Sequence, residues 1–196
     1  MLVLIAGVFY SCDMIEKKDN KQEEEQEKVL RQVTFNGDPL TLLGEPVKEG
    51  DKAPDFKLLS KDLSEKTLHD FEGKVKVLAI YPSIDTGVCA SQNRHANELF
   101  NLEDVVVLSV SCDLPFAQSR FCEAEGLENI VTLSDHRDVS FGLAYGYLIK
   151  ELRLLARGLV VIDKTGIIRH VELVPELTHE PDYEKALAKV KGLLSS

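Results

Sequence analysis

The chain has 196 residues, and its 23 Lys and Arg residues against 33 Asp and Glu give a formal net charge of −10. This length suits one domain with a sizeable core. A strongly acidic protein repels phosphate backbones, which excludes nucleic-acid binding as an expected function. Four cysteines are too few for a small fold held together by disulfides, but they are enough for redox chemistry.

Residues 1–11 form a segment similar to a signal peptide. Their apolar run would span about 15 Å as a helix, half the thickness of a bilayer, so it is too short for a transmembrane helix. The run is followed by Ser11 and Cys12, and an apolar run that ends in a small residue before a cysteine resembles a bacterial lipoprotein signal. The resemblance implies lipid attachment at Cys12 and a location in the cell envelope, facing the periplasm. Since no Lys or Arg precedes the run, a disordered tail on a cytoplasmic protein is the alternative.

We interpret residues 12–28 as a charged tether. From Asp13 to Lys28 the chain has seven acidic residues, four lysines and no aromatic residue. Such a segment cannot bury enough apolar surface to offset the entropy lost on ordering. The folded domain is therefore expected over residues 29–196.

The folded part predicts alternating strands and helices. Two β-prone runs around Asn36 and Gly37 predict an N-terminal hairpin over residues 32–43. Apolar runs predict strands over residues 74–81, 105–110, 129–133, 158–163 and 167–173. Helical spacing predicts helices over residues 90–101, 116–125, 139–145 and 183–194. The fold class is therefore α/β, with helices flanking a sheet that a hairpin at Gly166 makes mixed.

The first of these helices is expected to bury one apolar stripe. Its members follow helical spacing and are Ala96, Leu99, Phe100 and Leu102.

Cys89 follows a predicted buried strand and begins the next helix. Unpaired N–H groups at a helix N-terminus favour a thiolate. Lowering the pKa of an ordinary thiol from about 8.5 to about 6 requires about 3.4 kcal/mol, whereas a helix end supplies about 0.3–2 kcal/mol. The hydroxyl of Thr86 and a nearby guanidinium would supply the difference. Spacing does not select among the six arginines beyond residue 90, which are Arg94, Arg120, Arg137, Arg153, Arg157 and Arg169.

Other interpretations of Cys89 follow from the residues alone. The cysteine is also of a size to fill a strand–helix junction as a small hydrophobic residue. The residues after it, Ala-Ser-Gln, contain no second cysteine for dithiol exchange. The histidines are scattered, so none is singled out for a Cys–His hydrolase and none has metal-ligand spacing with the cysteines. We expect no metal and no other cofactor.

Three long motifs carry a resemblance to a known family. They are Pro82-Ser-Ile-Asp-Thr-Gly-Val-Cys-Ala90, the segment 113–122 and the segment 156–163. They resemble the thiol peroxidase subfamily of the peroxiredoxins, of the atypical two-cysteine type. The likeness extends from about Gln32 to the C-terminus. The resemblance implies a thioredoxin-like domain with an N-terminal hairpin, usually a homodimer. It also implies a substrate, hydrogen peroxide or an organic hydroperoxide, and a thioredoxin-like reductant.

The same resemblance assigns roles to individual residues. Cys89 resembles the peroxidatic cysteine and Cys122 the resolving cysteine, which together form an intrachain disulfide. Thr86 resembles the hydroxyl that orients peroxide and thiolate, Arg157 the guanidinium that stabilises both, and Pro82 the proline that shields the pocket. A disulfide requires Cα atoms within about 7 Å. We therefore expect the helix of Cys122, or the first turn at Cys89, to unfold locally.

Cys112 is the third thiol of the folded part. The residues alone leave three pairings open among Cys89, Cys112 and Cys122, whereas the resemblance makes Cys112 a buried bystander. Family patterns usually have Phe at the position of Ala96, a departure that affects helix packing or the dimer face. Two other functions remain as alternatives: an envelope lipoprotein that is a binding module, and a thiol:disulfide exchanger on the same scaffold.

Overall fold

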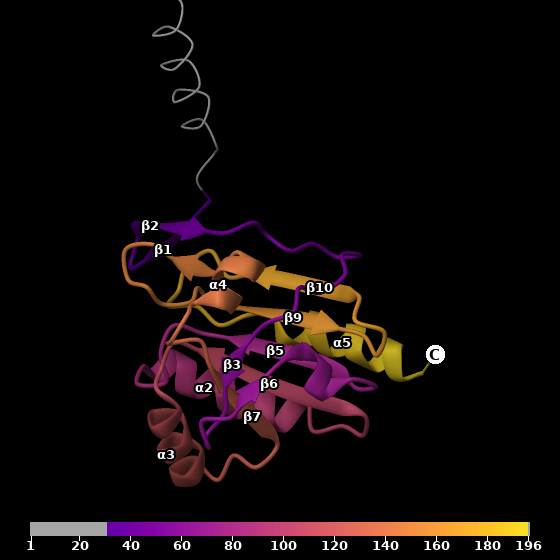
Figure 1. The fold of residues 1–196 in the computed structure, drawn as a ribbon. Helices are drawn as coiled ribbons and strands as arrows, with labels where there is room; N and C mark the ends of the chain where they lie inside the picture. The colour runs from indigo at the N-terminus through magenta and orange to yellow at the C-terminus, as the bar shows by residue number, and fades with distance from the viewer. Residues whose placement is uncertain (1–30, 196) are drawn as a thin grey trace, which may run out of the picture. The chain divides into compact units, whose positions relative to one another are not determined.

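The main sheet of the molecule is mixed, as the sequence predicts. The computed structural model describes residues 31–195, so the signal-like segment 1–11 and the whole tether 12–28, with Cys12, lie outside the described residues. Within residues 31–195 seven strands form one sheet in the order β10-β9-β5-β6-β7-β3-β4 (Figure 1). Their bounds are β3 Leu58–Leu59, β4 Glu65–Lys66, β5 Val75–Ile80, β6 Val105–Ser111, β7 Ile130–Ser134, β9 Gly158–Ile162 and β10 Ile168–Leu173. β5, β6 and β7 pair in parallel, whereas β9 is antiparallel to both β5 and β10.

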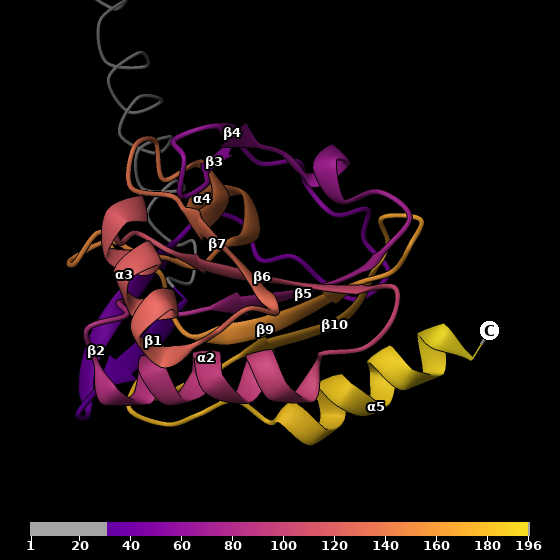
Figure 2. The ribbon, with the colours of Figure 1, turned by 90° about the horizontal axis from the view of Figure 1, so that it is seen from below.

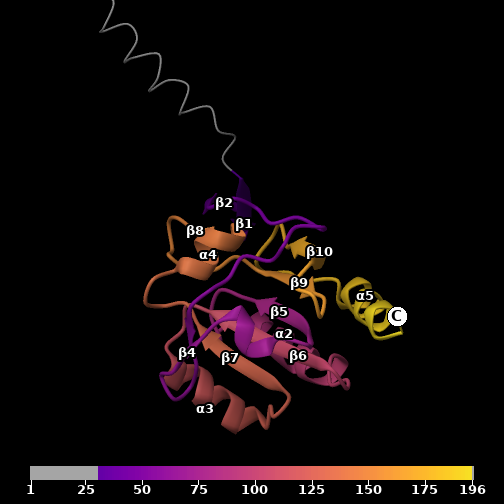
Figure 3. The same cartoon turned by 45° about the vertical axis from the view of Figure 1, so that its right-hand side comes forward.

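A second, smaller sheet is formed by the N-terminal hairpin and one short strand. Its order is β1-β2-β8, and Figure 3 shows these strands beside α4. The bounds are β1 Gln32–Phe35, β2 Asp38–Leu43, β8 Leu148–Ile149 and α4 Ser140–Tyr145. The hairpin turns at Asn36 and Gly37, which have φ of 52° and 87°, so it uses the left-handed backbone that this residue pair adopts readily. The expected N-terminal hairpin is confirmed.

Two hydrophobic clusters cover the two faces of the main sheet. Because side chains alternate along a strand, Leu78 and Ile80 of β5 point into one cluster, while Val77 and Ala79 point into the other. α2 and α5 cover the second face, where Ala96 packs in the core (Figure 2). Family patterns usually have Phe at this position, so the change to Ala96 affects how α2 packs against the sheet. The helix bounds are α2 Gly87–Leu99, α3 Pro115–Glu125 and α5 Tyr183–Leu194.

The first expected helix differs from α2 in two ways. It begins at Gly87 rather than residue 90, so Cys89 lies within its first turn. Leu99 was expected in the buried stripe, but it is 37% exposed, and this prediction is wrong. The buried side of the first turns carries the polar residues Gln92 and Asn93 instead, so the apolar pattern does not follow the buried face. No helix in the described range is long and apolar enough to cross a membrane.

Four short elements were not expected from the sequence. They are β3, β4, β8 and the 3₁₀ helix η1, Leu68–Phe71. Each strand has two residues, too few for an alternating pattern to be recognised.

Asp163 organises the turn between β9 and β10. One carboxylate oxygen accepts hydrogen bonds from the backbone N–H groups of Thr165 and Ile167, and the other accepts one from Arg169 Nε at 2.7 Å. Burial opposes ionisation, but these hydrogen bonds outweigh it and lower the pKa of Asp163 to about 2. The ionised carboxylate therefore stabilises the folded state.

We expect Asp163→Asn to lower the free energy of unfolding by about 2 kcal/mol at pH 7. A group with a lowered pKa contributes stability above its unfolded pKa, 3.8, and loses it as the pH falls toward its folded pKa, about 2. The difference between wild type and variant should thus shrink between pH 4 and pH 2, as measured by urea denaturation. Asp38→Asn, at an exposed carboxylate, is the matched control. A difference that stays constant down to pH 2 would contradict the assignment.

Candidate active site

Cys89 lies in the first turn of α2 with two donors directed at its sulfur. The residue is fully buried. Thr86 Oγ1 lies 2.8 Å from Cys89 Sγ, and Arg157 Nη2 lies 3.2 Å from it. The Thr86 hydroxyl has one proton and its other neighbour, the Ser83 carbonyl oxygen, is farther away at 3.3 Å, so geometry favours donation to the sulfur. Two donors on one sulfur, one of them charged, stabilise a thiolate.

Arg157 is held in place by three contacts. The residue is 2% exposed and directly precedes β9. Its Nε donates to the Leu177 carbonyl oxygen at 3.0 Å, and its Nη1 donates to Gln92 Oε1 at 2.6 Å. None of the three acceptors that Arg157 contacts is a carboxylate. Among these three, the sulfur of Cys89 is the one that can carry a full negative charge. Because a buried cation is costly unless it is paired, this arrangement also favours the thiolate.

Gln92 connects the guanidinium to the sheet. Its side-chain oxygen accepts from Arg157, and its Nε2 donates to the carbonyl oxygens of Ile80 and Gly158, at 3.1 and 3.4 Å. Sequence reasoning missed this residue. The available signal was its position three residues after Cys89, which places both on one side of a helix.

Asp113 fixes the loop that leads to Cys89. Its carboxylate accepts hydrogen bonds from Ser83 Oγ and from the backbone N–H of Ile84, both at 2.8 Å, and from Ser111 Oγ at 2.7 Å. The contacts tie the β5–α2 loop to the end of β6. Asp113 lies in a recognised motif, but its role as an anchor could not be read from spacing.

A mostly apolar cavity of about 280 Å³ opens above the buried sulfur. Thr86 and Arg157, which both contact Cys89, line this cavity, whereas Cys89 itself does not. Pro82 forms part of its wall. The other lining residues come from the hairpin, the β5–α2 loop, the start of α2 and two later loops: Phe35, Ser83, Gly87, Val88, Leu152, Leu154, Leu177 and Thr178. A small molecule in the cavity would thus meet the hydroxyl and the guanidinium next to the sulfur.

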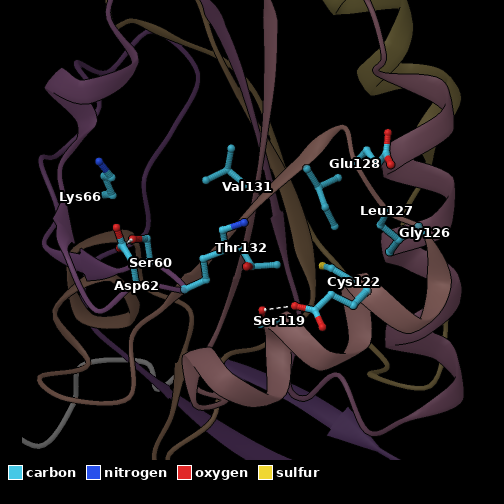
Figure 4. Close-up of a pocket in the computed structure, with 13 residues that line it drawn as sticks. Ser60, Asp62, Lys66, Ser119, Cys122, Gly126, Leu127, Glu128, Val131 and Thr132 are labelled. Carbon is cyan, nitrogen blue, oxygen red and sulfur yellow. Dashed lines mark hydrogen bonds between the residues drawn. The ribbon is translucent and has the colours of Figure 1, made fainter.

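Cys122 lies on α3 and lines a different cavity. This cavity measures about 630 Å³, and Figure 4 shows Cys122 on its α3 side, across from Ser60, Asp62 and Lys66. Cys122 is half-buried, and burial raises the pKa of its thiol. Cys89, Cys112 and Cys122 are all free thiols in the described part of the chain. The structure therefore does not bring Cys122 to the sulfur of Cys89, although its neighbour Phe121 packs against the cluster of Tyr81, Ile84 and Cys89.

The helix that carries Cys122 is weakly packed. Among its eleven residues only Pro115 and Gln118 are buried, and Phe116 is 55% exposed. Gln118 Nε2 donates to Ser111 Oγ and to the Leu133 carbonyl oxygen, but its side-chain oxygen is buried and has no hydrogen-bond partner in the described part of the chain. Few buried contacts and an unsatisfied polar atom indicate a low cost of local unfolding.

Cys112 is half-buried rather than fully buried as expected. Burial, together with the neighbouring carboxylates of Asp135 and Asp113, raises the pKa of its thiol to about 12. Because the thiolate is the nucleophile, Cys112 is a poor candidate for exchange in the folded protein. This fits the interpretation of Cys112 as a bystander.

The chain is similar to known proteins of one family. The protein-family model described as Redoxin matches residues 48–187. Two curated relatives are named thiol peroxidase: one from Listeria monocytogenes, 53% identical over 163 residues, and one from Bacillus subtilis, 51% identical over 166 residues. These alignments cover 83% and 84% of this chain and 99% of each relative. The solved structure of a peroxiredoxin-like protein from Aquifex aeolicus is 42% identical, with a TM-score of 0.78, over 83% of this chain and 97% of that chain.

Proposed function

The chain belongs to the thiol peroxidases, a group of peroxiredoxins within the Redoxin family, and we propose that Cys89 is the sulfur that attacks the peroxide. The observation that supports this assignment is the pair of contacts from Thr86 and Arg157 to one buried sulfur beside a cavity. Among residues 31–195 neither Cys112 nor Cys122 has a comparable pair of donors, and burial raises the pKa of both.

The first step is displacement at a peroxide oxygen. The Cys89 thiolate attacks one oxygen of the hydroperoxide in line with the O–O bond, so a sulfur–oxygen bond forms as the O–O bond breaks. Cys89 is oxidised to a sulfenic acid, and the departing oxygen takes up a proton and leaves as water or an alcohol. Arg157 and Thr86 border both the sulfur and the cavity, where they stabilise the charge that moves onto the leaving oxygen.

The cavity fits both hydrogen peroxide and organic hydroperoxides. Its walls are mainly apolar, and Phe35, Leu152 and Leu154 lie where the carbon part of an organic hydroperoxide would extend. The peroxide group itself would contact the two polar residues next to the sulfur.

The second step joins Cys89 to Cys122. The Cys122 thiol attacks the sulfenic sulfur, a disulfide bond forms, and the hydroxyl group leaves as water. Since Cys122 lines a different cavity, this step requires movement, and the weak packing of α3 makes this helix the segment that unfolds. A thioredoxin-like dithiol then supplies two electrons by thiol–disulfide exchange and restores both cysteines.

The protein acts as a homodimer in this proposal. Exposed large hydrophobic residues on β1, at the start of α3 and in the loop after β8 support it, since such groups commonly mark an interface: Phe35, Leu114, Phe116 and Leu152. A sedimentation mass of one chain at micromolar concentration would contradict it.

We expect Cys89→Ser to abolish peroxide consumption and Gln92→Leu to slow Cys89 oxidation about 10- to 100-fold. The Leu side chain removes one acceptor from Arg157, and a hydrogen bond to a charged group contributes about 1.5–3 kcal/mol. Because the chain has no tryptophan, stopped-flow loss of peroxide is the measurement.

Glu98→Leu, an exposed position on the same helix, introduces the same residue outside the site and should leave the rate unchanged. Wild-type rates in Gln92→Leu, or activity in Cys89→Ser, would contradict the roles proposed.

Hydrogen exchange tests the unfolding of α3. The amides of residues 116–125 should exchange faster in the oxidised protein than in the reduced protein, measured by mass spectrometry. Cys122→Ser treated with peroxide is the matched control, because it cannot form the disulfide and should keep the protection of the reduced protein. Equal protection of both wild-type forms, or a Cys89–Cys112 bond in the peptide map, would overturn the proposed resolution step.

The proposed location is the cell envelope, with lipid on Cys12. The support is the apolar run over residues 1–10 followed by Ser11 and Cys12, together with the charged tether after it. Metabolic labelling with a fatty acid should label the wild type and fail to label Cys12→Ser. Absence of label in the wild type would leave the cytoplasmic alternative.

A further inference from the structure

The carboxylate of Glu176 binds the turn of the N-terminal hairpin. Glu176 lies in the loop between β10 and α5. Its Oε2 accepts hydrogen bonds from Thr34 Oγ1 at 2.8 Å and from the backbone N–H of Gly37 at 3.1 Å. Its Oε1 accepts one from the backbone N–H of Asn36 at 3.1 Å. Because Asn36 and Gly37 have φ of 52° and 87°, their successive N–H groups converge on the carboxylate, as in an anion-binding nest.

The same carboxylate also binds its own loop. Oε1 accepts hydrogen bonds from the backbone N–H of Thr178 at 3.1 Å and from Thr178 Oγ1 at 2.8 Å. These contacts lower the pKa of Glu176 to about 2, and the hydrogen bond from Thr34 is the largest cause. At neutral pH the side chain is therefore an ionised acceptor that joins the hairpin to the loop.

Phe35 lies between the hairpin residues that Glu176 binds. Thr34 precedes it, and the two turn residues follow it. The Phe35 side chain is 47% exposed, so packing alone does not fix the position of its ring. Phe35 nevertheless lines the cavity beside the reactive sulfur, and Thr178 lines it from the loop. Glu176 thus fixes two parts of the cavity wall without being part of that wall.

The support of Arg157 by the same loop does not use the Glu176 side chain. The backbone N–H of Leu177 donates to the Thr34 carbonyl oxygen at 2.8 Å, and the Leu177 carbonyl oxygen accepts from Arg157 Nε at 3.0 Å. Loss of the carboxylate should therefore disturb the hairpin turn and Phe35 more than the guanidinium next to the sulfur.

We propose that Glu176 is a positioning residue for substrate selection: its carboxylate holds the hairpin turn so that Phe35 contacts the organic part of a hydroperoxide in the cavity. The inference rests on the proposed function, which places that part of the substrate along the apolar wall. Hydrogen peroxide has no organic part, so its reaction does not depend on Phe35. The ratio of the two reaction rates therefore reports the role of Glu176.

Stopped-flow loss of peroxide from the fully reduced chain, with cumene hydroperoxide and with hydrogen peroxide, tests this role. We expect Glu176→Gln to slow the reaction with cumene hydroperoxide about tenfold and the reaction with hydrogen peroxide less than about twofold. The amide has the shape of the carboxylate but only one oxygen that accepts hydrogen bonds. Glu103→Gln, at an exposed carboxylate before β6, is the matched control and should keep both rates.

A double-mutant cycle links Glu176 to Phe35. Phe35→Ala should produce the same selective loss with cumene hydroperoxide. The double variant, Phe35→Ala with Glu176→Gln, should lose no more than Phe35→Ala alone, because both changes remove the same contact with the substrate. The sedimentation mass of every variant should equal that of the wild type, since Glu176 acts within one chain.

The outcomes separate this inference from the proposed function. A wild type that consumes neither peroxide would overturn both. If the wild type consumes both peroxides, an unchanged ratio in Glu176→Gln, additive losses in the double variant, or a selective loss that accompanies a changed mass would overturn the positioning role alone. Should Glu176→Gln fail to fold, Thr34→Val decides, since it removes one donor and keeps the shape of the side chain. It should slow cumene hydroperoxide selectively, and an unchanged ratio would refute the role.

Discussion

The contact between the Arg157 guanidinium and the Cys89 sulfur joins parts of the chain 68 residues apart, and the chemistry of the site depends on it. The fold makes this contact possible through one antiparallel pair in the middle of the sheet. Because β9 runs against β5, the residue before β9 lies beside the loop after β5, as the pairing of Ile80 with Gly158 shows. A strand parallel to β5 would have its carboxyl end, rather than its amino end, at this edge of the sheet. The mixed sheet is therefore a condition of the site.

Local sequence predicted the longer strands, most helix positions and the placement of Cys89, because apolar runs and helix starts are short-range features. Arg157 could not be chosen from six arginines on that basis, since its approach depends on the register of strands far apart in sequence. Family resemblance, rather than periodicity, selected it. Gln92 was missed and Leu99 wrongly placed for one shared reason: α2 buries polar groups that hold the guanidinium, so its buried face does not carry an apolar stripe.

The two cysteines lie in regions of different rigidity. Cys89 and its partners are fixed by the central strands, by Gln92 and by the Asp113 anchor, so the attacking sulfur is pre-organised. Cys122 lies on a helix with two buried residues. A peroxidase that forms a disulfide between distant cysteines needs both properties, because displacement requires exact geometry while resolution requires movement. This division follows from packing alone.

Arg157 and Lys76 present the same physical problem at opposite ends of the central strands. Each is a cation with 2% exposure, and each must offset the cost of leaving water. Arg157 does so within the protein, through a carbonyl oxygen, an amide oxygen and a sulfur that can carry charge. Lys76 has no such set among the described residues: burial lowers its pKa, and the charges of Asp163 and Glu72 act in the opposite direction. Arg157 is thus held by direct hydrogen bonds, whereas Lys76 is balanced by nearby carboxylates without an ion pair among the described residues.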